Sequence, residues 1–213
     1  MSDQTEKIYQ QKKEEALEHL TSIRHYLVDK KIFFPYNYNA TFVWSLIAVI
    51  LTLNMVTFYA MGIGKGSAVI SMLITVGFIA EAVMTKKVNR SYDIEDCTVR
   101  QRFIMQNFVM ISFFLIVVSA VLAQYALYVP IYLMWLFLIS LGYYAVGYVL
   151  NIRPFSHMAR FNMLLAIVLL LLASLKGHLK GVESSCFLIV QAAVILGLSI
   201  LPAIIAWHQK KGL

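Results

Sequence analysis

Long apolar runs separated by short polar connections dominate the chain. Six runs are continuously apolar, at about 41–61, 67–84, 103–125, 131–150, 158–175 and 186–207. Each is close to the roughly 20 residues that an α-helix needs to cross a hydrocarbon core of about 30 Å. The runs do not alternate between apolar and polar residues, as the strands of a membrane barrel do. The pattern therefore predicts an all-α, polytopic membrane protein with six transmembrane helices.

The first 40 residues follow a different pattern and predict a cytoplasmic amphipathic helix ending in a surface turn. Between residues 3 and 31, Ala16, Leu20, Ile23 and Leu27 recur at helical spacing and share one face. That apolar face can lie on the membrane surface or pair with another helix. The expected organisation is this segment at 1–40, a six-helix transmembrane domain at 41–207 and a cytoplasmic tail at 208–213.

Composition strengthens the membrane assignment. The chain is 60% hydrophobic and only 14% charged, whereas soluble domains carry about 25% charged residues. A soluble fold of 213 residues could not hide so much apolar surface from water. The net charge of +7 does not indicate nucleic-acid binding, because the Lys and Arg residues form no stripe interleaved with aromatic residues.

The distribution of basic residues predicts the orientation. Of the 18 Lys and Arg residues, all but Lys65, Lys176 and Lys180 fall in the N-terminal segment, the second and fourth connections and the C-terminal tail. Because Lys and Arg are retained on the cytoplasmic side, both termini should be cytoplasmic, in the cell (inner) membrane. Trp44 and Trp207 are expected in the aromatic belt at that interface.

Glu81 is the one acidic residue within a predicted span and is the first functional candidate, since intramembrane charge is costly. With Asn54, Asn107 and Gln191 it could border a polar or ionic pathway. The alternative is structural: Glu81 pairs with Lys86 or Lys87 at the interface, and the amides form hydrogen bonds between helices. No span is expected to be interrupted centrally, because Pro202 lies near the end of the sixth run.

A second candidate is a partner-docking surface. It would combine the apolar face of the N-terminal helix with acidic residues of the second connection, namely Leu20, Ile23, Leu27, Asp93, Glu95 and Asp96. The alternative for the second connection is a solvated cytoplasmic loop.

Sequence motifs for chemistry are lacking. The five histidines lie outside the predicted spans, and the glycine-rich segment at 62–66 lacks the spacing of a nucleotide fingerprint, so it is expected to be a turn. We therefore predict no catalytic residues, no cofactor and no metal site.

The predicted function is a non-enzymatic accessory, regulatory or assembly protein of the lipid bilayer. It would act through contacts of its helices and cytoplasmic loops with further copies or a membrane protein partner. The alternative is a small-solute or ion transporter or channel with Glu81 near the pathway.

Overall fold

The computed structural model describes residues 36–89 and 95–211, with side chains placed for 36–85 and 102–210. The described residues form helices and no strands. The helices are α2 (Tyr38–Ala60), α3 (Ile63–Asn89), α4 (Glu95–Gln124), α5 (Tyr128–Val149), α6 (Arg153–Leu175), α7 (Ser185–Ile195), η1 (Leu196–Ile200) and α8 (Leu201–Lys211).

Six helical segments are long and apolar enough to cross a membrane, with α7, η1 and α8 together forming the sixth. The all-α fold and the six candidate spans are therefore confirmed. The predicted amphipathic helix of residues 3–31 lies outside the described residues.

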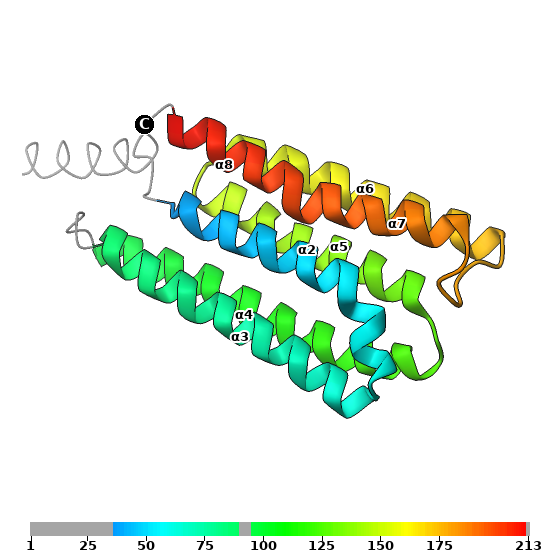
Figure 1. Ribbon diagram of the computed structural model, residues 1–213. Coiled ribbons are helices and arrows are strands. Elements are labelled where there is room, and N and C mark those ends of the chain that lie inside the picture. Colours follow the sequence, from blue (N-terminus) through cyan, green and yellow to red (C-terminus); the bar gives the residue numbers. More distant parts are fainter. Residues whose placement is uncertain (1–35, 90–94, 212–213) are drawn as a thin grey trace, which may run out of the picture. The chain divides into compact units, whose positions relative to one another are not determined.

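The spans pack side by side in a bundle (Figure 1). The α3/α4 pair lies along one side, α2 and α5 occupy the middle, and α6 packs with the α7–α8 segment on the other side. The start of α2 and the end of α8 share one end of the bundle, where Lys210 Nζ donates to Asn39 Oδ1 at 3.0 Å. An even number of crossings thus places both ends of the described bundle on the same side.

Helix α5 is the central element. Within its candidate span 56% of the residues are buried, against 17–33% in the other five. The other spans expose large apolar side chains, such as Met72 of α3, Phe113 of α4 and Leu171 of α6. Water would disfavour such a surface, whereas hydrocarbon would solvate it.

Polar side chains and glycine define several helix boundaries. Asn37 caps α2 by accepting from the Ala40 amide at 3.3 Å, and Ser184 caps α7 by accepting from the Phe187 amide at 3.2 Å. Gly62 adopts a φ of +109°, which glycine tolerates best, between α2 and α3. The turn expected at 62–66 is therefore shorter than predicted, because α3 already begins at Ile63.

The sixth span contains an irregularity that the sequence analysis did not expect. Its centre is a π-helical turn, Leu196–Ile200, and Pro202 lies in the second position of α8, well before the end at Lys211. Proline has no amide hydrogen and its ring crowds the carbonyl four residues earlier, so a regular helix is disfavoured there. Helical structure nevertheless continues from Ser185 to Lys211, so the π-helical turn changes the hydrogen bonding of the span without interrupting it.

Neighbouring helices satisfy part of the irregular backbone. Asn162 Nδ2 of α6 donates to the Gly197 carbonyl oxygen at 3.0 Å, and Ser45 Oγ of α2 donates to the Ser199 carbonyl oxygen at 3.0 Å. Gly197 also permits this approach, since a Cβ there would lie 2.9 Å from Asn162 Oδ1. Such side-chain donors allow a disrupted helix to persist away from water.

Candidate functional site

A cavity that is partly open to the surface lies between α2, α3, α4 and α5, and Val194 of α7 and Leu198 of η1 contribute to its wall. Its volume is about 80 Å³, measured as the space open to the centre of a water molecule. One ordered water requires roughly 10–15 Å³ on this measure, so the cavity has room for several waters or one small molecule. It extends from Tyr36 and Glu81, at one end of the bundle, past Ser112 near the middle of the Arg102–Gln124 span, to Met55, five residues before the end of α2.

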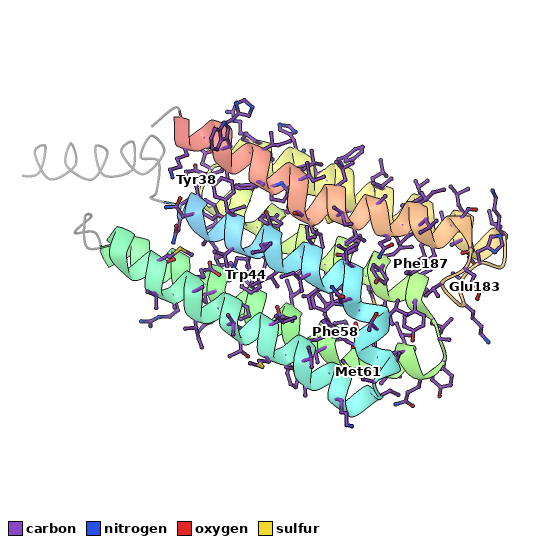
Figure 2. The ribbon with its side chains drawn as sticks, viewed as in Figure 1. Tyr38, Trp44, Phe58, Met61, Glu183 and Phe187 are labelled. Atoms are coloured by element: carbon purple, nitrogen blue, oxygen red, sulfur yellow. The ribbon has the colours of Figure 1, made fainter. Side chains whose placement is uncertain are left out.

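Glu81 is partly buried and lines this cavity. Trp44 Nε1 of α2 donates a hydrogen bond to Glu81 Oε2 of α3 at 2.8 Å. Trp44 lies on the side of α2 that faces α3 (Figure 2), and its ring meets Phe78 edge-on at 4.9 Å between centroids. The carboxyl group therefore faces the cavity with one neutral N–H donor and an aromatic neighbour.

Gly77 makes this arrangement possible. It lies four residues before Glu81, on the same face of α3. A Cβ at Gly77 would lie 2.8 Å from Trp44 Cη2 and 2.8 Å from Ile47 Cδ1. Only the absence of a side chain lets the indole lie this close to α3 while it reaches the carboxylate.

Aromatic rings surround the end of the cavity near Glu81. Phe108 of α4 contacts Tyr143 of α5 edge-on, with centroids 5.9 Å apart. Tyr143 stacks on Phe155 of α6 at 5.4 Å, and Phe155 meets Tyr36 at 5.3 Å. Gly142 makes room for Phe108, since a Cβ there would lie 2.6 Å from the ring. Helices α4, α5 and α6 are thus joined to the start of α2 by ring contacts.

Hydrogen bonds between helices occupy the polar groups nearer the middle of the bundle. Tyr132 Oη of α5 donates to the Thr52 carbonyl oxygen of α2 at 2.7 Å, and Gln191 Nε2 of α7 donates to the same oxygen at 3.0 Å. Trp135 Nε1 of α5 donates to Ser119 Oγ of α4 at 2.9 Å. Tyr132, Thr52 and Trp135 all line the cavity. Their hydrogen bonds therefore hold the helices together and also fix the side chains of the cavity wall.

The four residues predicted for a pathway do not all meet at this cavity. Glu81 lines it, whereas Asn54, Asn107 and Gln191 are absent from its wall. Asn54 Nδ2 donates to the Ile50 carbonyl oxygen of its own helix at 3.0 Å. Gln191 holds α7 against α2, as the structural alternative for the amides anticipated.

Most of the predicted docking residues lie outside the described part of the chain. Leu20, Ile23, Leu27 and Asp93 fall in ranges that the structure does not describe. Glu95 and Asp96 are the first two residues of α4, but their side chains are not described. The side chains of Lys86 and Lys87 are also outside the described set, so their predicted pairing with Glu81 stays a prediction.

The sequence analysis did not assign the rest of the cavity wall to a site. Trp44, expected in the interfacial belt, contacts Glu81 across 37 positions of sequence, and no local pattern predicts that pairing. Phe108 and Tyr36 resembled ordinary apolar and surface residues. Gly77, one turn from the intramembrane acid, was the one available signal of a close helix approach.

Comparison with known proteins gave no relatives: no family model, no curated protein and no solved structure matches the chain.

Proposed function

We propose that the protein is a multi-pass membrane protein that binds a small solute in the cavity beside Glu81 and moves it across the bilayer. One observation carries the proposal: the carboxyl group of Glu81, four residues before the end of the Ile63–Thr85 span, lines a cavity within the bundle. Acidic residues within spans usually face a partner or a polar cavity, and they commonly mark solute and ion pathways. A largely apolar pocket with few polar groups is also the usual form of a small-molecule site.

The sixth span offers a place where the cavity wall can change shape. Val194 and Leu198 line the cavity, and the π-helical turn Leu196–Ile200 lies at this part of the wall. π-helical turns are frequent at functional sites. Rearrangement of this turn would move Leu198 and so alter the cavity wall.

The proposed orientation follows from the basic residues. Fifteen of the 18 Lys and Arg residues belong to the side that carries both termini. The proposal therefore places the termini in the cytoplasm and the protein in the cell (inner) membrane. In this orientation the Glu81 end of the cavity lies near the cytoplasmic surface.

Cysteine reactivity tests whether the cavity is reached by water. Ser112 of α4 lines the cavity, while Met110 of the same helix is 69% exposed on the outer face of the bundle. Each position is changed to Cys in a chain carrying Cys97→Ser and Cys186→Ser. The thiolate of cysteine is the nucleophile that attacks the reagent, and thiolates form in water but not in hydrocarbon.

A small, water-soluble methanethiosulfonate should modify Ser112→Cys in membrane vesicles at least about tenfold faster than Met110→Cys. Equal and negligible rates would mean a dry cavity, and the transport proposal would be wrong. The non-enzymatic accessory role would then be the better proposal, with Leu20, Ile23 and Leu27 as its first targets.

A further inference from the structure

The chemistry of the cavity wall narrows the solute class. We infer that the cavity binds a small organic monocation, an ammonium group attached to a compact apolar body. This inference rests on the proposed function, since it names the solute of the same cavity.

Charge gives the sign of the solute. Among the described residues that line the cavity, Glu81 is the one ionisable at neutral pH, and its charge is negative. No basic side chain lines the cavity in this part of the chain. The Trp44 N–H is a neutral donor, and it contacts only one of the two carboxylate oxygens. A positively charged occupant would compensate the buried carboxylate, whereas an anion would be repelled by it.

The aromatic wall favours a cation that carries an apolar body. Trp44, Phe78, Phe108 and Tyr143 line the cavity around the Glu81 end. Aromatic faces attract ammonium groups, and the attraction grows when water is excluded. The same rings provide apolar contact for the alkyl body of the solute.

An inorganic cation is less well served by this wall. Magnesium and calcium need about six to eight oxygen ligands in place of their hydration shells. Here the wall carries a single carboxyl group, Glu81, and its hydroxyl oxygens are spread along the cavity. The Tyr36 hydroxyl bonds to Thr41 Oγ1 at 3.1 Å near the Glu81 end, whereas the Tyr132 and Thr52 hydroxyls donate to the carbonyl oxygens of Thr52 and Ala48, at 2.7 Å and 2.6 Å, further along. A primary ammonium group has three N–H donors, which the two carboxylate oxygens and one hydroxyl oxygen can accept, and its alkyl body needs only apolar contact.

Size limits the body of the solute. The cavity volume of about 80 Å³ is smaller than the roughly 150 Å³ cavity that accommodates benzene. A solute of about five non-hydrogen atoms, such as a branched butylamine, therefore matches the space better than a polycyclic cation.

Three probes of one skeleton test the inference: isobutylammonium, neutral isobutanol and anionic isobutyrate. The purified full chain is titrated in detergent while tryptophan fluorescence is recorded, in a Trp207→Phe background. The two remaining tryptophans, Trp44 and Trp135, both line the cavity. Isobutylammonium should bind at least about tenfold more tightly than either other probe.

The matched variants are Glu81→Gln, which removes the charge, and Glu81→Asp, which retains it. Glu81→Gln should abolish the preference for isobutylammonium over isobutanol, and Glu81→Asp should keep it. Equal binding of amine and alcohol by the unsubstituted cavity, or tighter binding of isobutyrate, would overturn the inference without any variant.

The two proposals fail in different ways. If Ser112→Cys is reactive but isobutylammonium has no advantage, the solute class is wrong and solute transport stands. If Ser112→Cys is unreactive and no probe binds, both proposals are wrong.

Discussion

At the scale of single residues, the environment of Glu81 depends on small neighbours as much as on its hydrogen-bond donor. The indole of Trp44 reaches the carboxylate because Gly77 leaves space for it on α3. Gly142 of α5 leaves space in the same way for the ring of Phe108 of α4. Both glycines lie inside helices, where glycine costs about 0.5–1 kcal/mol relative to alanine, so close packing of a ring offsets a loss in helix stability.

Gly77→Ala should therefore disturb the site although alanine is the better helix former. The added methyl group would overlap the Trp44 ring, and the rigid indole can avoid it only by leaving Glu81. We expect a loss of about 1–3 kcal/mol in stability, typical of overpacking, and a changed tryptophan emission spectrum. Reversible unfolding in mixed micelles measures the first, and fluorescence measures the second.

Gly64→Ala is the matched control on the same helix, because a Cβ there meets nothing within 4 Å. It should leave stability unchanged or raise it by up to about 1 kcal/mol. Equal losses in the two variants would show that helix propensity, and not contact with Trp44, decides the effect.

At the scale of elements, hydrophobic runs predict which segments form apolar helices. They do not predict the residues at which each helix begins and ends. The first run, 41–61, agrees closely with α2, Tyr38–Ala60. The third run begins at residue 103, yet α4 begins at Glu95, because its first turns are helical and polar. Hydropathy reports the thickness of the lipid core, whereas a helix can extend beyond it.

The sixth span shows a second limit of the element-scale prediction. The position of Pro202 near the end of the sixth run gave no indication of a π-helical turn, and a kink, a break and a π-helical turn are all compatible with one proline. The observed form depends on donors from other helices, Asn162 and Ser45, whose positions relative to Gly197 and Ser199 only the tertiary structure provides.

Asn162→Ala should consequently destabilise the bundle through the sixth span. Asn162 is fully buried, and its amide donates to the Gly197 carbonyl oxygen. Removing it leaves a carbonyl in the irregular turn without that donor and opens a small void, with an expected cost of about 1–3 kcal/mol.

Asn54→Ala is the control, because Asn54 bonds to its own helix and is only partly buried. Its cost should stay below about 0.5 kcal/mol. Unfolding measured under identical detergent conditions compares the two, and a cost for Asn54→Ala equal to that for Asn162→Ala would refute this role of Asn162.

At the scale of the whole molecule, the fold was largely predictable and the site only in part. Composition and run length sufficed for six apolar helices, because lipid thickness imposes one length on every span. Glu81 stood out for a similar reason, since an acid within a span is costly anywhere. Its partner Trp44 did not, because the pairing depends on how α2 packs against α3, which hydropathy does not determine.

The central position of α5 was likewise hidden from the sequence analysis. Its run is no more apolar than that of α4 or α6, yet it is the most buried of the spans. Gly142 and Gly147 allow neighbours to approach it closely: a Cβ at Gly147 would lie 2.6 Å from the Ser156 backbone nitrogen. Burial of one span among six is a property of the packed bundle.

Orientation is the last whole-molecule prediction, and it rests on charge alone. Gly64 and His208 are both exposed; Gly64 is the second residue of α3 and His208 lies near the end of α8. The start of α3 and the end of α8 lie at opposite ends of the bundle (Figure 1). In a chain lacking Cys97 and Cys186, a membrane-impermeant maleimide should label Gly64→Cys in intact cells. His208→Cys should react only after the membrane is opened, because the basic side is retained in the cytoplasm. Labelling of His208→Cys, but not Gly64→Cys, in intact cells would reverse the orientation and place the Glu81 end of the cavity at the outer surface.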